Sequence, residues 1–407
     1  MSLPLADESV DLVVTSPPYN ALRSYTDGGE HYEWQIGSEA TPQEFLEALW
    51  VWTAECRRVL KPSGSLFCNL GDKYAGGGMG GHGLGLHGPP PQGERNSYRR
   101  PTNTGGIPAK SLMGLPWRYA IGCIDQLGLI LRAEVIWSKP NGLPESVTDR
   151  VRRSHEQWFH FTKEPRYFSA VDEVREPHVE AQRPGVLTWD ERRGRADAAA
   201  RYSDQNGHGG TAGMAQSPLG KLPGSVWTIP TEPLRVPDHI GVDHFAAFPS
   251  EWPRRIILGW SPSGVCVACG EGRRPVVAKE QIGGHIRTRA DTPALGVGRK
   301  PSGHMAPGAL SGFTTEATIT GYACACPDTT APTRPAVVLD PFAGTGTVPA
   351  VAHILGRHGI GVDLSADYLR LAEWRCNDPG LRAKVLRVDK PKAVPDGQLD
   401  IFGGEAA

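Results

Sequence analysis

The chain has 407 residues with a formal net charge of -1, and 39% of its residues are hydrophobic. The length predicts one large α/β domain with inserted segments, and the balanced charge gives no general electrostatic case for binding nucleic acid. No apolar stretch has the length of a membrane span, no signal peptide is visible, and the eight cysteines are not spaced as a small disulfide framework. We therefore expect a cytoplasmic protein without a membrane partner.

The first predicted element is a buried strand over residues 10–14, which is short, rich in β-branched residues and mostly apolar. Residues 15–20 follow at once and read Thr-Ser-Pro-Pro-Tyr-Asn. Ligands bind at strand ends in open α/β sheets, and the two prolines hold the residue before each in an extended conformation. The turn can therefore present the Ser16 hydroxyl and a main-chain carbonyl as fixed acceptors beside the ring of Tyr19. The alternative is an ordinary proline-rich turn.

An exocyclic amino group of a nucleobase is a chemical partner that suits this turn. Its nitrogen is a poor nucleophile because the lone pair is delocalised into the ring. Two acceptors that bind both N–H groups favour a tetrahedral nitrogen and aim its lone pair at an electrophile, which is catalysis by positioning and electrostatics. An aromatic side chain can hold the base by stacking once the base has left the duplex.

Scaffold elements come next. Residues 41–44 read Thr-Pro-Gln-Glu, which predicts a helix with a capping box and a proline at its first position. An apolar helical face extends to residue 60, and residues 61–64, Lys-Pro-Ser-Gly, end it. Residues 76–106 are rich in Gly, Pro and His and are interpreted as a mobile loop. Four cysteines are interpreted as small buried residues rather than nucleophiles: Cys56, Cys68, Cys123 and Cys376.

Two cysteine pairs flank an insertion of irregular composition. Cys266 and Cys269 form a CxxC pair, and Cys324 and Cys326 form a CxC pair. Four thiolates in two close pairs are what tetrahedral Zn²⁺ requires, and four protein ligands leave no water position, so the zinc site would be structural. Zinc would close residues 270–323, a long Gly-rich loop with little apolar content. The alternative is four unrelated thiols or a redox pair.

The last predicted element is a strand, a Gly-rich turn and a helix. The turn, residues 340–346, reads Asp-Pro-Phe-Ala-Gly-Thr-Gly, and Pro349 and Gly356 mark the helix that follows. Glycines let the backbone approach a ligand closely, and a helix N-terminus favours a polar or anionic group. The next strand, residues 359–363, ends in Asp363, about 20 residues after Gly344, the spacing at which a carboxylate meets ribose hydroxyls. We predict a site for a nucleoside cofactor, and not for a dinucleotide, because Pro349 stands where a G-x-G-x-x-G motif has its third glycine.

With both turns in view, the chain resembles the DNA amino-methyltransferases, which use S-adenosylmethionine to methylate cytosine N4 or adenine N6. The Ser-Pro-Pro-Tyr element precedes the Asp-Pro-Phe-Ala-Gly-Thr-Gly element, an order that resembles the permuted β group of that family. Intervening segments resemble further motifs of the family, in order, at residues 65–72, 115–118, 135–141, 154–163 and 245–258.

The resemblance implies a doubly wound, mostly parallel α/β sheet of the Rossmann-like methyltransferase type. It implies catalytic roles for Ser16, Pro17, Pro18 and Tyr19. It also implies that S-adenosylmethionine is bound by Asp340, Phe342, Gly344, Gly346 and Asp363. Serine before Pro-Pro-Tyr is typical of cytosine-N4 members, so we expect site-specific methylation of cytosine N4 in double-stranded DNA with a flipped target base. A companion restriction endonuclease is an expected partner.

The expected organisation follows from these assignments. The catalytic half of the methyltransferase domain is expected at residues 1–75 and 111–173, the cofactor-side segment at 239–262 and the cofactor-binding half at 331–378. The other expected parts are the mobile loop at residues 76–110, a target-recognition region at 174–238, a zinc-ribbon-like insertion at 263–330 and a tail at 379–407. The zinc ligands would be Cys266, Cys269, Cys324 and Cys326.

Other interpretations fit the same residues. The target could be adenine N6, or the substrate could be RNA. A protein that binds cofactor and DNA without catalysis is a further hypothesis, because only fourteen residues precede Thr15 and part of the cofactor pocket could be missing. Residues 76–106 either close over DNA or have no function, and residues 174–238 could be a solvated linker.

Overall fold

The computed structural model describes residues 2–19, 26–27, 30–31, 35–76, 104–142, 144–177, 217–234, 236–237, 240, 248–282, 314–328 and 330–389. The chain divides into two compact units. Unit 1 contains Met1–Ala170, Gly224–Arg274 and Cys324–Ala407, and unit 2 contains Val171–Pro223 and Pro275–Ala323. Most of the predicted mobile loop and of the predicted recognition region lies outside the described residues.

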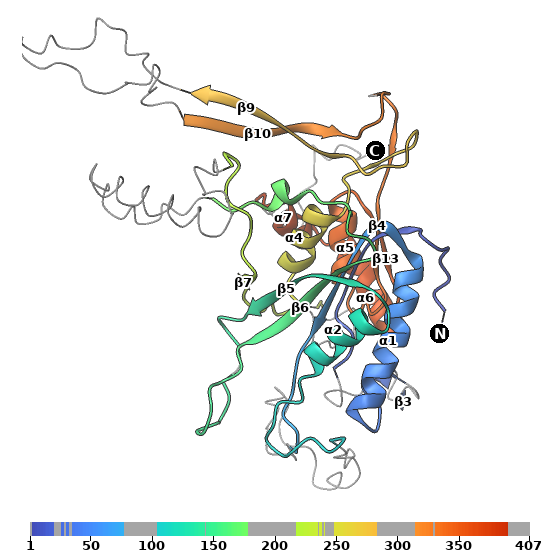
Figure 1. Ribbon diagram of the computed structural model, residues 1–407, viewed down its shortest axis with the longest axis vertical. Coiled ribbons are helices and arrows are strands. Elements are labelled where there is room, and N and C mark those ends of the chain that lie inside the picture. Colours follow the sequence, from blue (N-terminus) through green and yellow to red (C-terminus); the bar gives the residue numbers. More distant parts are fainter. Residues whose placement is uncertain are drawn as a thin grey trace, which may run out of the picture. The chain divides into compact units, whose positions relative to one another are not determined.

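A seven-stranded sheet in the order β13-β12-β1-β4-β6-β5-β7 forms the centre of unit 1 (Figure 1). Neighbouring strands are parallel except along β6, which is antiparallel to both β4 and β5. This confirms the predicted α/β class with a mostly parallel sheet. The strands are β1 (Val10–Thr15), β4 (Leu60–Leu70), β5 (Ile130–Ser138), β6 (His155–Thr162), β7 (Val226–Thr228), β12 (Val337–Asp340) and β13 (His358–Gly361).

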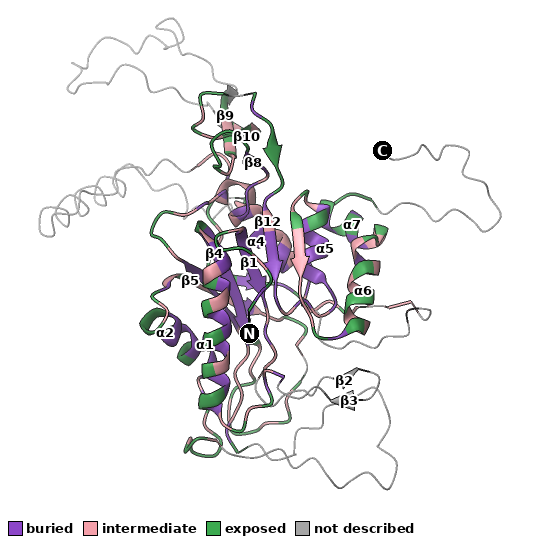
Figure 2. Ribbon diagram, turned by 90° about the vertical axis from the view of Figure 1, so that its right-hand side faces the viewer, coloured by how far each residue is buried: buried purple, intermediate pink, exposed green. Residues whose placement is uncertain are grey.

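β1 lies inside the sheet with all six of its residues buried, as its apolar sequence predicts (Figure 2). Its Val13 is in register with Leu339 of β12 on one side and with Leu66 of β4 on the other. The first strand of the chain therefore pairs directly with a strand near its C-terminal end.

Helices cover both faces of this sheet. Helices α1 (Pro42–Val59) and α2 (Leu115–Asp125) contribute to one buried apolar cluster, together with Val13 of β1. The other buried cluster contains Leu12 of β1 and residues from α4 (Glu251–Trp260), α5 (Thr347–Ile354) and α7 (Pro379–Leu386). α6 (Ala366–Cys376) contacts α5. Helices on both faces are what a doubly wound sheet requires.

Helix α1 begins as predicted. Thr41 accepts a hydrogen bond from the Glu44 N–H, and the Glu44 side chain accepts one from the Thr41 N–H, which completes the capping box. The helix ends at Val59, but β4 starts at Leu60 without a turn, so residues 61–64 belong to a strand and not to a loop. Of the four cysteines predicted to be buried, Cys56, Cys68 and Cys123 are buried, and Cys376 is half-buried.

The structure corrects three further boundaries. Residues 270–323 were predicted as a loop but contain a two-stranded sheet of β9 (Arg274–Ile282) and β10 (Thr314–Ala323), and both strands are rich in the β-branched residues that favour strands. β7 lies within residues 174–238 yet belongs to the main sheet. The predicted tail begins with α7, whose Leu381 and Val385 are buried.

Small elements complete the described part. β8 (Val265–Cys266) pairs antiparallel with β11 (Thr333–Arg334), and β2 (Thr26–Asp27) pairs antiparallel with β3 (Glu30–His31). Unit 2 contains a short 3₁₀ helix (Val171–Val174) besides most of β9 and β10. Among the residues that the structure describes, no helix is both long enough and apolar enough to cross a membrane.

Candidate active site

The connections that leave the two central strands run in opposite directions. β1 continues through α1 to β4 on one side, and β12 continues through α5 to β13 on the other. In open α/β sheets, ligands bind at such a switch point, outside the carboxyl ends of the strands. Thr15 ends β1, and its hydroxyl donates to Oδ1 of Asp340, which ends β12, at 2.8 Å. Both turns predicted from the sequence therefore start at this point.

Asn69, near the end of β4, contacts both Ser16 and Tyr19. The Tyr19 hydroxyl donates to Asn69 Oδ1 at 2.8 Å, and the Ser16 hydroxyl donates to the same oxygen at 3.2 Å. Asn69 Nδ2 donates to the carbonyl of Gln157 at 3.0 Å, which fixes the orientation of the amide. A serine hydroxyl whose proton points to Asn69 retains a lone pair to accept from an external donor.

A carboxylate and a lysine extend this network. Glu156 Oε2 lies 2.8 Å from the Tyr19 hydroxyl, and Glu156 Oε1 pairs with Lys139 Nζ at 2.5 Å. Burial, and secondly the charge of Glu156, raise the pKa of Tyr19 well above its ordinary value, so the hydroxyl stays protonated and donates. Lys139 follows β5 and Glu156 is near the start of the reversed strand β6, which places both at the carboxyl edge of the parallel strands.

Gly71 provides the space for the Tyr19 ring. A Cβ atom added at Gly71 would lie 2.6 Å from Tyr19 Cε2, which is closer than non-bonded carbon atoms approach. The ring therefore packs directly on the backbone that follows β4. Four of these residues were given no site role from the sequence, although their segments were matched to family motifs: Asn69, Gly71, Lys139 and Glu156. A polar or glycine residue at the end of a strand was the signal that could have found them.

The predicted cofactor residues lie in and around the turn between β12 and α5. Asp340 Oδ1 also accepts from the Phe342 N–H at 3.1 Å, whereas Asp340 Oδ2 is buried and has no hydrogen-bond partner among the described residues. Burial raises the pKa of Asp340 to about 7. Asp363 was predicted to end a strand, but it lies two residues beyond the end of β13. Its carboxylate accepts hydrogen bonds from the N–H groups of Gly344 at 2.7 Å and Ser365 at 2.9 Å.

Packing fixes the shape of the same turn. Gly346 is the N-cap residue of α5 with φ +72°, and a Cβ there would lie 2.4 Å from Cβ of Ala372 in α6. The buried Arg375 donates through Nη1 to the hydroxyls of Thr345 and Thr347, both at 2.7 Å. The Phe342 ring lies 4.7 Å, between centroids, from the ring of Trp52 in α1.

Residues 65–72 and 115–118, two other segments singled out from the sequence, also come together. Asp72 lies just beyond β4, and its carboxylate accepts from the N–H groups of Gly114 at 3.0 Å and Leu115 at 3.1 Å. A carboxylate at this place satisfies the free N–H groups of a helix start and attaches α2 to the end of β4.

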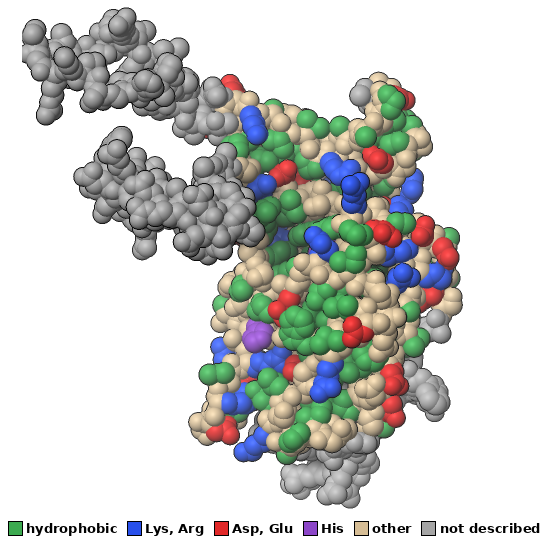
Figure 3. Space-filling view, in the orientation of Figure 1, with side chains coloured by type: hydrophobic (Ala, Val, Ile, Leu, Met, Phe, Trp, Pro, Cys, Tyr) green, Lys and Arg blue, Asp and Glu red, His purple; other side chains and the backbone are tan. Residues whose placement is uncertain are grey.

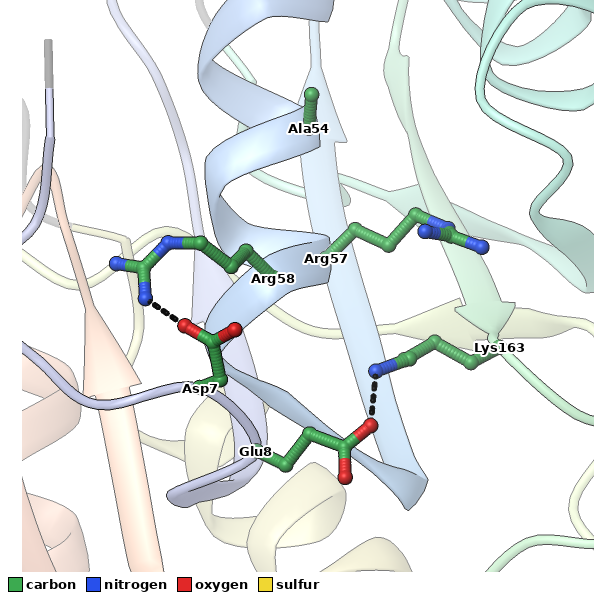
Figure 4. Close-up of a pocket in the computed structure, with 6 residues that line it drawn as sticks. All are labelled: Asp7, Glu8, Ala54, Arg57, Arg58 and Lys163. Carbon is green, nitrogen blue, oxygen red and sulfur yellow. Dashed lines mark hydrogen bonds and ion pairs between the residues drawn. The ribbon is translucent and has the colours of Figure 1, made fainter.

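A surface hollow of about 450 Å³ lies at the opposite, amino edge of the sheet (Figure 4). Asp7 and Glu8 precede β1, and their carboxylates pair with Arg58 and Lys163, the latter at 3.1 Å. Because these charges satisfy one another and lie at the other end of β1 from Ser16, the hollow is not part of the candidate active site.

The four predicted metal-ligating cysteines come together in unit 1. The sulfur atoms of Cys266, Cys269 and Cys326 all lie within 4.8 Å of one another. Cys324 Sγ lies 3.7 Å from Cys269 Sγ. All four thiols are free.

Comparison with known proteins identifies the family. The family model for DNA methylases of the N6/N4 type matches residues 10–271 and 331–373. The type II methyltransferase M.XycI of Xanthomonas campestris pv. cyanopsidis is 43% identical over 173 residues, which cover 42% of this chain and 54% of that protein. M.SmaI of Serratia marcescens, also a type II methyltransferase, is 33% identical over 279 residues, which cover 68% of this chain and 78% of that protein.

Among solved structures, PvuII DNA methyltransferase (cytosine-N4-specific) aligns with a TM-score of 0.48 at 15% identity, over 95% of this chain and 89% of that one. The chain thus spans about half the length of M.XycI and most of the length of M.SmaI. Because the family model matches the larger part of the chain, including both turns at the switch point, the protein belongs to the N6/N4 DNA methylase family.

Proposed function

We propose that the protein transfers a methyl group from S-adenosylmethionine to the N4 amino group of cytosine at a specific site in DNA. The observation that carries the proposal is the hydrogen bond between Thr15 and Asp340 at the switch point. The turn with Ser16 and Tyr19 starts at Thr15, and the turn with Gly344 and Gly346 starts at Asp340. The family membership, and two relatives named as type II methyltransferases, support the reaction class.

The turn after β12 fits S-adenosylmethionine. Asp340 has a buried carboxylate oxygen without a partner among the described residues, and the first turn of α5 has no side-chain cap. The residues that would hold the cofactor are Asp340, Phe342, Gly344, Gly346 and Asp363. When bound, the cofactor supplies a methyl group made electrophilic by a sulfonium charge.

The first turn would activate the amino group. The Ser16 oxygen and the Pro17 carbonyl accept its two N–H groups, and Pro18 keeps the turn rigid. The Tyr19 ring, fixed by Asn69, Glu156 and Gly71, stacks on the flipped base. With the cofactor bound, these acceptors would aim the nitrogen lone pair at the methyl group. Transfer would form the N–C bond as the methyl carbon–sulfur bond breaks, leave a neutral thioether, and release the extra proton of the nitrogen to solvent. Zinc, for which the four cysteines are candidate ligands, takes no part in this transfer.

A basic loop supports DNA as the substrate. Residues 139–154 connect β5 and β6 at the carboxyl edge and include Lys139, Arg150, Arg152 and Arg153. Three of these also pair with carboxylates of the chain: Lys139 with Glu156, Arg150 with Glu145 and Arg153 with Asp72. Basic and acidic side chains alternate over the face seen in Figure 3, so phosphate contacts would depend on this local group of cations. We propose target recognition for the part of residues 174–238 that lies outside β7. We also propose a restriction endonuclease as a companion, as the type II names of the relatives suggest.

Transfer of tritiated methyl groups to DNA tests the proposal. We expect the wild type to label DNA, and digestion to nucleosides to release N4-methylcytosine. Ser16→Ala and Tyr19→Ala should label far more slowly, whereas Ser9→Ala, at a half-buried serine near the amino edge, should match the wild type.

Three outcomes would contradict parts of the proposal. N6-methyladenine in the digest would refute the assigned base. Label on RNA but not on DNA would refute the substrate. A wild type that binds DNA and transfers no label would refute the enzymatic function. Sequencing of the modified DNA would then report the recognition site.

A further inference from the structure

The spacing of the four cysteine sulfurs is that of metal ligands and not of disulfides. A disulfide requires sulfurs about 2.05 Å apart. Four sulfurs placed tetrahedrally at about 2.3 Å from one zinc ion lie about 3.8 Å from one another. Cys269 and Cys324 have sulfurs 3.7 Å apart, and the sulfurs of Cys266, Cys269 and Cys326 lie within 4.8 Å of one another.

The backbone around Cys266 and Cys269 is folded to present sulfurs. The N–H groups of Ala268 and Cys269 donate to the Cys266 sulfur, and that of Glu271 donates to the Cys269 sulfur. Gly270 adopts φ +74°, and nothing lies within 4 Å of where its Cβ would be, so the chain turns there without strain.

The second cysteine pair is brought to the first by the short sheet of β8 and β11. Cys266 of β8 is in register with Thr333 of β11, and the Val267 N–H donates to the Pro332 carbonyl at 3.0 Å. The Arg273 guanidinium donates to the Ala331 carbonyl at 2.6 Å. Val265 and Ala331 are buried beside these contacts, whereas Val267 is 54% exposed and Cys269 is exposed, so the side of the cysteine pair that faces solvent has little apolar cover among the described residues.

The position of the cysteines in the chain indicates what a bound metal would do. The chain leaves unit 1 after Arg274 and returns to it at Cys324, so one pair precedes the excursion and the other follows it. The family match omits residues 272–330, which contain Cys324 and Cys326. The cysteine pairs therefore flank an insertion that the common fold of the family does not hold in place.

We propose that Cys266, Cys269, Cys324 and Cys326 bind one structural zinc ion that joins the two ends of the β9–β10 insertion. Four soft thiolates select zinc among the common divalent ions, and four protein ligands leave no coordination position for water or substrate. Binding releases the thiol protons to solvent and changes no oxidation state. The metal acts as a crosslink between the two cysteine pairs.

Metal analysis of the full-length chain, expressed in zinc-supplemented medium, tests the proposal. We expect about one zinc ion per chain. A mercurial reagent should release that zinc as about four thiols react. After exchange with cobalt(II), the protein should show the strong visible absorption of a tetrahedral thiolate site. These readouts do not depend on methyl transfer, so they hold or fail separately from the proposed enzymatic function.

Substitution provides the matched control. Cys324→Ser combined with Cys326→Ser should lose the bound zinc, whereas Cys376→Ser, at a half-buried cysteine of α6, should retain it. The cobalt spectrum of the wild type keeps the test valid if the double variant does not fold. The proposal would be overturned if the wild type bound no zinc or bound iron instead. It would also be overturned if the double variant kept its zinc, or if freshly purified protein had disulfides among these four cysteines.

Discussion

The direction of the Ser16 hydroxyl depends on Asn69. Asn69 Oδ1 accepts from both Ser16 and Tyr19, and its amide cannot reverse without losing the hydrogen bond from Nδ2 to Gln157. Without Asn69, the Ser16 hydroxyl could turn its proton toward the bound base, and that proton would repel the N–H groups of the amino group. Because Asn69 Oδ1 takes the proton of the hydroxyl, the lone pairs of the Ser16 oxygen remain free to accept from the amino group. This is the preorganisation that catalysis by electrostatics requires.

Replacement of Tyr19 by phenylalanine separates the ring from the hydroxyl. Tyr19→Phe keeps the stacking surface and removes the donor shared by Asn69 and Glu156. Loss of about one net hydrogen bond, about 1.4 kcal/mol, should slow methyl transfer about 10-fold. Tyr19→Ala should slow it considerably more, because the ring is lost as well. Single-turnover rates with both variants check this, and equal rates would show that the hydroxyl network alone matters.

The buried carboxyl of Asp340 predicts a dependence of stability on pH. Its pKa is raised to about 7 in the folded chain, mainly by burial, above the ordinary value of 3.8. The folded state thus retains a proton that the unfolded state has lost, so stability falls as the pH rises from about 4 to about 7. The full effect is on the order of 4 kcal/mol.

Asp340→Asn should remove this dependence. The amide oxygen can still accept from Thr15 and Phe342, and the variant does not titrate. Without cofactor, we expect the variant to gain stability over the wild type as the pH increases through this range. Urea denaturation at about pH 4.5 and about pH 8 measures the difference. A constant difference between the two proteins at both values would contradict the assignment.

At the scale of elements, the turn between β12 and α5 is shaped by its neighbours as much as by its glycines. Asp363 binds the Gly344 N–H from beyond β13, and Arg375 of α6 binds the hydroxyls of Thr345 and Thr347. Among the ion pairs of the described residues, none includes Arg375, so its buried guanidinium is held by hydroxyl and carbonyl oxygens. The turn would lose its shape if α6 moved.

Two glycines that flank helix α5 allow a matched test of this packing. Gly346 and Gly356 have φ values of +72° and +75°, but a Cβ at Gly346 would lie 2.4 Å from Ala372, whereas nothing lies within 4 Å of a Cβ at Gly356. Gly356→Ala should cost about 1 kcal/mol for the left-handed conformation alone. Gly346→Ala should cost about 2 kcal/mol more because α6 must shift. Thermal unfolding compares them, and equal losses would show that α6 does not confine the turn.

At the scale of the whole molecule, β1 connects the two ends of the chain. Asp11, a buried carboxylate in an otherwise apolar strand, pairs with Lys61 of β4 at 2.5 Å and accepts from the Val337 N–H of β12 at 2.8 Å. Together with the bond between Thr15 and Asp340, it fastens β1 to β12 at both ends. The two halves of the candidate active site are thus joined through one strand.

Removal of the Asp11 carboxylate should weaken the junction of the two halves. Asp11→Ala leaves Lys61 and the Val337 N–H without this acceptor and should lower the free energy of unfolding by about 3 kcal/mol. Asp7→Ala removes a carboxylate that is 73% exposed, from the pair with Arg58, and should have a much smaller effect. Urea denaturation followed by tryptophan fluorescence measures both, and equal losses would contradict the role given to Asp11.

Local patterns were sufficient for the elements whose causes are local. The apolar run before Ser16, the capping box at Thr41 and the glycines at 344 and 346 specify a strand, a helix start and a turn from neighbouring residues alone. β9 and β10 were missed because each strand is stabilised by the other across an insertion rich in glycine, and α7 was missed because its small apolar face becomes visible only when it packs.

The sequence by itself determined the α/β class, the two turns and the set of four cysteines, because each depends on residue type at short spacing. Only the tertiary structure decided that Thr15 binds Asp340, that Asn69 orients Ser16, and that Glu156 and Lys139 reach Tyr19. These contacts join residues far apart in the chain, and their geometry depends on strand order and on the reversed direction of β6. No short-range pattern encodes that order, because it results from the packing of helices on both faces of the sheet.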